Sequence, residues 1–123
     1  MPVQRDTLTR FLDEFNAKHN CQLSAVIARS GMPMAWSTNA TVAMDVFSSL
    51  SATIVGAAEV IYSDLNKEPP SRILIVSPNG ILIATGLGKK AVFVVVAPGM
   101  DDSLLKGIEV LAASVREVLT AET

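Results

Sequence analysis

A nucleophile and a base could be supplied by two residues near the N-terminus. Cys21 is the only cysteine and His19 the only histidine in the 123 residues, and a thiol beside an imidazole is an arrangement that nucleophilic enzymes use. The sequence shows no third group to orient the histidine, and a cysteine at the start of a strand is commonly a small buried side chain. We therefore expect no catalytic residue and no enzyme. One cysteine and one histidine also provide no cluster for a structural metal.

Two further motifs have a chemical interpretation and a simpler structural one. Asp101 and Asp102 are paired carboxylates, but at the start of a helix such side chains cap free N–H groups and meet the positive end of the helix dipole. The run 86–90, GLGKK, superficially resembles a phosphate loop, yet those loops precede a helix and here a strand follows. We expect a cap and a tight turn, and no cofactor.

Composition indicates a protein partner. Half of the residues are hydrophobic and 18% are charged, against about a quarter charged in typical globular domains. The ten basic residues are scattered and the net charge is −2, which gives no footprint for nucleic acid. No apolar run approaches the roughly 20 residues of a membrane span, and the first residues lack the apolar core of a signal peptide. These features predict a cytoplasmic protein without membrane insertion.

The elements that position these residues follow from periodicity. Apolar residues at helical spacing predict a first helix capped by Asp6 or Thr7, a long helix from about Thr41 to Leu65, and a last helix that starts near Asp101 to Ser103. Apolar and β-branched runs bounded by turn residues predict five strands. These strands are expected at 21–28, 34–37, 72–76, 81–85 and 91–97.

The order αββαβββα predicts one α/β (α+β) domain over residues 1–123. Pro78-Asn79-Gly80 predicts a tight hairpin, because Asn-Gly readily takes positive φ angles. The segment 91–97, AVFVVVA, is apolar throughout, which is typical of a central strand covered on both faces. Three helices are available to cover the sheet, so a three-layer sandwich is expected.

The long helix carries the strongest signal for self-association. We place its core stripe around Leu50 and Ile61, and the opposite side then has almost no charge. A surface helix of this length normally points several charges outward, so another chain is expected to cover that side. The predicted contact residues on the helix are Met44, Ser48, Ala52, Val55, Gly56, Glu59 and Tyr62.

The strand after the long helix is the second element expected at a contact between copies. Its residues are apolar and include no proline, so its free backbone groups at a sheet edge would invite pairing with another strand. These residues are Arg72, Ile73, Leu74, Ile75 and Val76. A two-fold homodimer would satisfy the helix and the strand together.

Three segments carry a resemblance to a known family. They are Ala25 to Pro33 (AVIARSGMP), Leu50 to Glu59 (LSATIVGAAE) and Arg72 to Gly88. In these segments, and in the order of its elements, the chain resembles the roadblock family, which is named for a dynein light chain and includes archaeal and bacterial regulators of small Ras-like GTPases. The matching positions are apolar and small residues rather than a catalytic signature.

The resemblance implies a fold and a role. It implies a five-stranded antiparallel sheet with the long helix on one face and the N- and C-terminal helices on the other, and a dimer that joins edge strands and long helices. It also implies a non-enzymatic adaptor or scaffold on which a Ras-like small GTPase, a motor or a signalling complex assembles.

Two alternatives remain open at this stage. A small-ligand sensory α/β domain would show a cavity of roughly 300 Å³ or more with a few convergent polar groups, whereas the expected core is almost wholly apolar. Met32-Pro33-Met34 and Trp36 suit either an exposed partner contact or ordinary edge packing.

Overall fold

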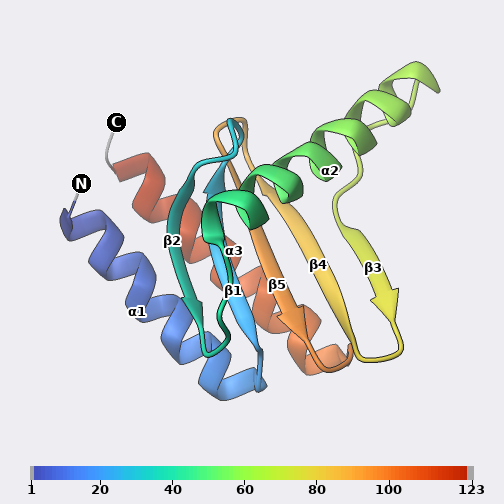
Figure 1. Cartoon of the computed structure of the whole chain (residues 1–123). Helices are drawn as coiled ribbons and strands as arrows, with labels where there is room; N and C mark the ends of the chain where they lie inside the picture. Colours follow the sequence, from blue (N-terminus) through green and yellow to red (C-terminus); the bar gives the residue numbers. More distant parts are fainter. Residues whose placement is uncertain (1, 122–123) are drawn as a thin grey trace.

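The computed structural model describes residues 2–121 and contains three helices and five strands in the predicted order αββαβββα (Figure 1). The helices are α1 (Pro2–His19), α2 (Met44–Asp64) and α3 (Asp102–Ala121). The strands are β1 (Leu23–Ala28), β2 (Pro33–Thr38), β3 (Ile73–Ser77), β4 (Gly80–Leu87) and β5 (Ala91–Ala97).

The strands form one antiparallel sheet in the order β2-β1-β5-β4-β3. The all-apolar strand β5 lies at the centre, as its sequence predicts, and six of its seven residues are buried. β2 and β3 are the two edges. Of the two edges, β2 is buried or half-buried, whereas β3 is mostly exposed.

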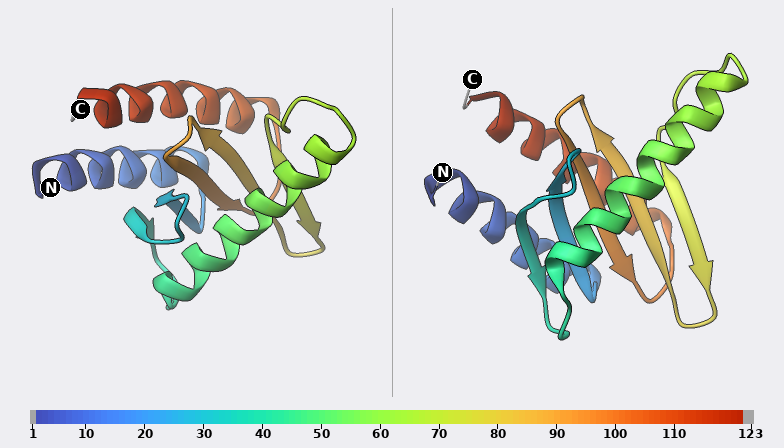
Figure 2. Two further views of the ribbon diagram at one scale, coloured as in Figure 1. Left: turned by 90° about the horizontal axis from the view of Figure 1, so that it is seen from above. Right: turned by 45° about the horizontal axis from the view of Figure 1, so that its top comes forward.

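The helices complete the three predicted layers. α1 and α3 lie side by side on one face of the sheet, and α2 crosses the other face obliquely (Figure 2). Under α1 and α3, Leu12, Phe15 and Ile108 pack against Phe93 of β5. Under α2, Val55 packs with strand residues of β1, β4 and β5. The core on the α1/α3 side is the larger of the two, which leaves α2 the less deeply seated helix.

The β3–β4 hairpin is confirmed, but its predicted backbone geometry is wrong. Ser77 pairs with Gly80 across a two-residue turn of Pro78 and Asn79, and neither Asn79 nor Gly80 has a positive φ. Pro78 fixes a negative φ at the first turn position, which excludes the turn type that Asn-Gly favours. Gly80 is needed for another reason, since a Cβ there would lie 2.9 Å from the Ala97 carbonyl oxygen of β5.

The two helix starts differ in how well they were predicted. The Leu104 N–H donates to Asp101 Oδ1 at 2.8 Å, so Asp101 caps α3 as expected. The predicted cap of α1 at Asp6 or Thr7 is wrong, because α1 already begins at Pro2. Proline suits a first helical turn, where its missing N–H would have no helical partner.

The orientation of α2 corrects the sequence interpretation most. The residues that α2 buries are Met44, Ser48, Ser51 and Val55, whereas Leu50 is 59% exposed and Ile61 56% exposed. The side predicted to meet a second copy therefore packs on the chain's own sheet, and the stripe predicted as core faces outward. The small side chains on the buried side explain the choice, since they let the helix backbone approach the sheet closely.

Candidate interaction surface

The outward side of α2 is a continuous apolar stripe, which we call the outer stripe. Its residues are Val46, Leu50, Ile54, Ile61 and Leu65, all of them exposed. Together with Ala57, positions 50, 54, 57 and 61 alternate steps of four and three, which is the spacing of a seam between two packed helices. Isolated apolar side chains on a surface are ordinary, but a stripe this long is typical of a contact surface.

Strand β3, which follows α2 in the chain, is an edge of the sheet and is also exposed and apolar. It pairs only with β4 among the described strands, so one row of its backbone groups faces outward. Leu74, Ile75 and Val76 are exposed, Val76 to 76%. An apolar edge strand with no charge or proline in its centre offers pairing sites for another strand.

The residues predicted for a homodimer contact differ in how exposed they are. Met44, Ser48 and Val55 are buried on the side of α2 that faces the sheet, so their prediction as surface residues is wrong. Ala52, Gly56, Glu59, Arg72 and Ile73 are half-buried, and Tyr62, Leu74, Ile75 and Val76 are exposed. The β3 part of the prediction is therefore available at the surface, whereas most of its α2 part is not.

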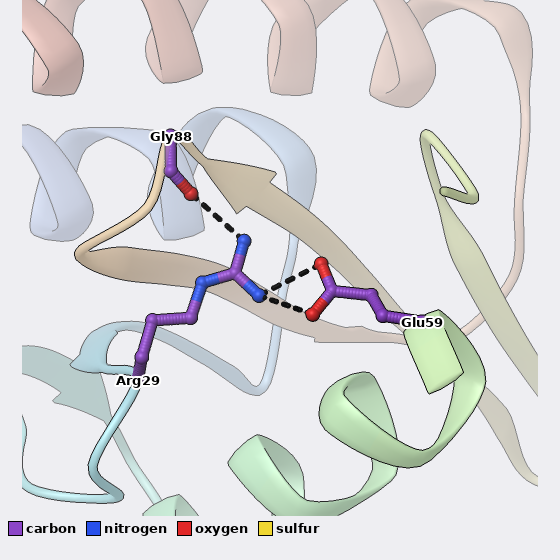
Figure 3. A network of polar contacts seen from close by, with 3 residues as sticks. All are labelled: Arg29, Glu59 and Gly88. Atoms are coloured by element: carbon purple, nitrogen blue, oxygen red, sulfur yellow. Dashed lines mark hydrogen bonds and ion pairs between the residues drawn. The ribbon is translucent and has the colours of Figure 1, made fainter. Parts of the chain in front are cut away.

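An arginine that links three segments holds α2 to the end of the sheet (Figure 3). Arg29 follows β1, and its Nη1 lies 2.7 Å and 2.8 Å from the two carboxylate oxygens of Glu59 on α2. Its Nη2 donates to the Gly88 carbonyl in the β4–β5 turn at 2.8 Å. Both side chains of the ion pair are roughly one-third exposed or less. Charge-assisted hydrogen bonds of this kind are stronger than neutral ones.

The sequence analysis missed this role of Arg29. A lone arginine at the end of the strand segment LSAVIA is a usable signal, because a cation at the end of an apolar run needs a partner. Its mate cannot be read from the sequence, since Glu59 is 30 positions away. The same contact explains why Glu59 is half-buried.

The methionine and tryptophan segment is mainly packed. Met34 contacts the α1/α3 core and Trp36 contacts the α2 core. The Arg5 guanidinium lies 4.9 Å from the centre of the Trp36 ring. Met32, at the β1–β2 turn, is 68% exposed. Edge packing therefore accounts for Met34 and Trp36, and only Met32 is available to a partner.

The residues with catalytic potential are not arranged for it. The Cys21 thiol approaches the His19 carbonyl oxygen at 3.9 Å, while the imidazole packs against Phe15 with ring centres 4.7 Å apart. Burial raises the pKa of the Cys21 thiol to about 11, which keeps it protonated and unreactive near neutral pH. Within residues 2–121, no three His, Cys, Asp or Glu side chains gather where they could hold a metal ion.

Gly88 to Lys90 forms a turn between two strands, as expected, but the first two residues of the predicted turn, Gly86 and Leu87, still belong to β4. β4 continues to Leu87, β5 begins at Ala91, and Gly88 takes a φ of +74°. No helix N-terminus follows the glycines, so the segment lacks the amide cradle of a phosphate loop.

By length and composition α2 would also qualify as a membrane-spanning helix, with a mean hydropathy of 1.4. The core helices of globular folds meet the same criterion. Here α2 lies on a sheet, with Met44 and Val55 buried against it. Its hydropathy therefore reflects two apolar sides, one on the sheet and one outward.

A groove of about 550 Å³ lies between α1 and α3, and it is open to solvent. Its volume falls within the range of small-ligand sites. The groove lies on the surface between two helices. A sensory domain would instead enclose its ligand between the helices and the sheet.

Comparisons with known proteins agree on this fold. The family model for the Roadblock/LC7 domain matches residues 8–97, and no curated protein matches. The structure of MglB from Myxococcus xanthus is similar with a TM-score of 0.89 at 13% identity, covering 96% of this chain and 91% of that one. A Roadblock/LC7 domain from Streptomyces avermitilis has a TM-score of 0.73 at 15% identity, covering 91% and 97%. Profilin IB from Acanthamoeba castellanii has a TM-score of 0.66 at 15% identity, covering 89% and 97%.

Proposed function

We propose, given that this chain belongs to the Roadblock/LC7 domain family, that it is a homodimeric adaptor that binds and regulates a Ras-like small GTPase or a related signalling or motor complex. Family membership supports a regulatory, adaptor-type role rather than a catalytic one. The single observation that carries the proposal is the exposed apolar surface formed by the outer stripe of α2 and the edge of β3.

The outer stripe supports pairing of two α2 helices. Its alternating steps of four and three would allow two copies to interlock side chains along a seam. Leu50 and Ile61 lie near the two ends of that seam, and each is more than half exposed in one chain. Burying side chains of this size contributes about 1.5–3 kcal/mol each.

The β3 edge supports the same two-fold arrangement. Two antiparallel β3 strands related by a two-fold axis would exchange backbone hydrogen bonds and extend the sheet across both copies. β3 follows α2 in the chain, and the C-terminal end of α2 lies toward the β3 edge of the sheet (Figure 1). One axis could therefore bring both elements together with their mates, as a self-complementary interface requires.

Membership of the family supports a GTPase partner, and binding such a partner needs no catalytic residue of this chain. An adaptor of this kind would act by binding one nucleotide state of the GTPase more tightly than the other, which shifts the population of that state. The buried, protonated Cys21 thiol and the capping role of Asp101 are consistent with such a role.

Light scattering after size exclusion tests the dimer. We expect the wild-type chain to have twice the monomer mass, and Leu50→Glu with Ile61→Glu to be a folded monomer, because two buried charges would face their mates across the seam. Ser63→Glu is the matched control, since Ser63 is exposed on α2 but lies outside the outer stripe. A monomeric wild type, or a dimeric double variant, would contradict the proposed interface.

The GTPase role is tested separately by titrating the chain into a Ras-like GTPase of the same cell, loaded with GTP or with GDP. We expect affinities that differ by about tenfold or more between the two states, equivalent to about 1.4 kcal/mol. Equal affinities together with unchanged GTP turnover would refute regulation and leave only scaffolding.

A further inference from the structure

We propose that the groove between α1 and α3 is a second docking site, which binds an amphipathic helix of a partner protein that presents acidic side chains at one end. The residues that line the groove belong to α1 and α3, and these two helices lie on the opposite face of the sheet from α2 (Figure 2). The groove is complete within one chain. It also uses α3, which begins beyond residues 8–97 that the family model matches. The inference therefore does not depend on the dimer.

The walls of the groove have the geometry that accepts a third helix. α1 contributes Phe11, Glu14, Phe15, Lys18 and His19, and α3 contributes Ser103, Lys106, Gly107, Val110, Leu111 and Ser114. Each set repeats every three or four positions, so each forms one straight stripe along its helix. The α3 stripe is about 16 Å long at 1.5 Å per residue. A helix of about three turns would match that length.

The floor of the groove is apolar, so apolar side chains of a partner buried against it would stabilise the complex. Phe11 and Leu111 are half-buried, and Val110 is 63% exposed. Gly107 lets the two helices approach, because a Cβ at this position would lie within van der Waals overlap of the His19 ring. His19 therefore covers the floor, and its ring nitrogens make no hydrogen bond within residues 2–121.

The charges on the rim select the partner. Lys18 and Lys106 are both exposed and neither belongs to an ion pair within the described part of the chain. Glu14 is the only acidic side chain in the lining, although the chain as a whole has a net charge of −2. A cationic rim on an acidic protein favours acidic side chains on the occupant.

The open shape favours a helix over a small molecule. Small-ligand sites bury about 70–90% of their ligand, whereas this groove has no roof, and both of its rims are exposed. A small apolar acid would leave one side in water. A helix would bury one apolar face and keep its polar face solvated, as amphipathic helices do in other grooves.

Binding can be measured with a synthetic amphipathic 14-residue peptide that carries leucines on one face and two glutamates at one end. A second peptide with lysines in place of the glutamates is the charge control. His19 is the only histidine and Trp36 the only tryptophan, so their ring NMR signals report separately on the groove and on the opposite face. We expect the acidic peptide to shift the His19 signals without shifting the Trp36 indole signal.

Variants of the chain locate the site. Val110→Asp should weaken binding of the acidic peptide by about tenfold or more, since it places a charge in the apolar floor. Ala113→Asp is the matched control, because Ala113 is exposed on α3 but does not line the groove. Lys18→Glu with Lys106→Glu should reverse the preference between the two peptides. Light scattering of the same variants should be unchanged, which separates this test from that of the dimer.

Three outcomes would overturn the proposal. One is equal binding of the two peptides, or binding that Val110→Asp leaves intact. Another is a shift of the His19 signals by dodecanoate but by neither peptide, which would make the groove a small-ligand site. In the last, the His19 signals change when the protein concentration alone is raised, and Val110→Asp abolishes this change. The occupant of the groove would then be a second copy of the chain.

Discussion

At the scale of single residues, burial decides what the one thiol can do. Cys21 is 7% exposed beneath the α1/α3 layer, and the loss of water around it raises its pKa to about 11 from the ordinary value of 9.0. Only the thiolate is a strong nucleophile. The neighbouring imidazole packs on Phe15 and offers the thiol no compensating charge. Cys21 therefore behaves as a small apolar side chain.

We predict that iodoacetamide modifies Cys21 much more slowly in the folded chain at pH 8 than in urea. The raised pKa also makes stability depend on pH, because the folded state holds the thiol proton more tightly than the unfolded state. The contribution is fully present below about pH 9 and is lost as the pH rises toward about 11. Urea midpoints should therefore fall over that range more steeply than in Cys21→Ala. Equal alkylation rates in the two states would show that the thiol is accessible.

At the scale of elements, α2 is held to the sheet by few contacts. Its buried residues are Met44, Ser48, Ser51 and Val55, and all lie in its first twelve positions. Its last turns, from Val60 onward, are exposed. The ion pair between Glu59 and Arg29 is the point where its C-terminal half is tied to the sheet (Figure 3). The helix that carries the outer stripe is thus packed on the sheet in its N-terminal half, and a single ion pair holds its C-terminal half.

We predict that Glu59→Gln lowers the free energy of unfolding by about 1 kcal/mol, because Arg29 loses its charged partner in a half-buried position. Hydrogen exchange should become faster in the C-terminal half of α2, where the contact is lost. Glu109→Gln is the matched control, since its pair with Arg72 is longer, at 3.3 Å, and Glu109 is 70% exposed. An equal effect of the two variants would show that the Arg29 contact is no more than a surface ion pair.

At the scale of the whole molecule, the two faces of the sheet are covered unequally. α1 and α3 together cover one face, whereas α2 alone crosses the other and leaves β3 exposed (Figure 2). The outer stripe and strand β3 leave large apolar side chains exposed on the α2 side, and contiguous apolar surface of this kind is typical of contact sites. Association through this side would add burial that one chain lacks. The stability of the protein should then be linked to its concentration.

We predict that the thermal midpoint rises with protein concentration, since only the folded chain can pair. Calorimetry from about 1 to 100 times the dimer dissociation constant should show a continuous increase. The monomeric variant with glutamate at positions 50 and 61 should have a lower midpoint that does not depend on concentration. A wild-type midpoint that stays constant over this range would mean that folding and pairing are not coupled.

Periodicity alone predicted most of the fold. The alternation of helical and strand patterns predicted the element order, the continuous apolar run of β5 predicted its central position, and Asp101 predicted the start of α3. These features are local, because they depend on residues close together in the chain. The predicted start of α1 was wrong, because the helix already begins at Pro2. The predicted positive φ angles of the β3–β4 turn were also wrong, because Pro78 fixes a negative φ at the first turn position.

The candidate site depended on a choice that local patterns cannot make. α2 is apolar on two sides, and the bulkier side, with Leu50 and Ile61, was assigned to the core. The sheet instead takes the side with Ser48 and Ser51, because small side chains fit the narrow space between a helix and a sheet. The amino-acid sequence by itself determined that this helix has two surfaces to cover and that β3 has an apolar edge. Only the tertiary structure decided which helix surface is already covered, since the packing partner comes from strands distant in the chain.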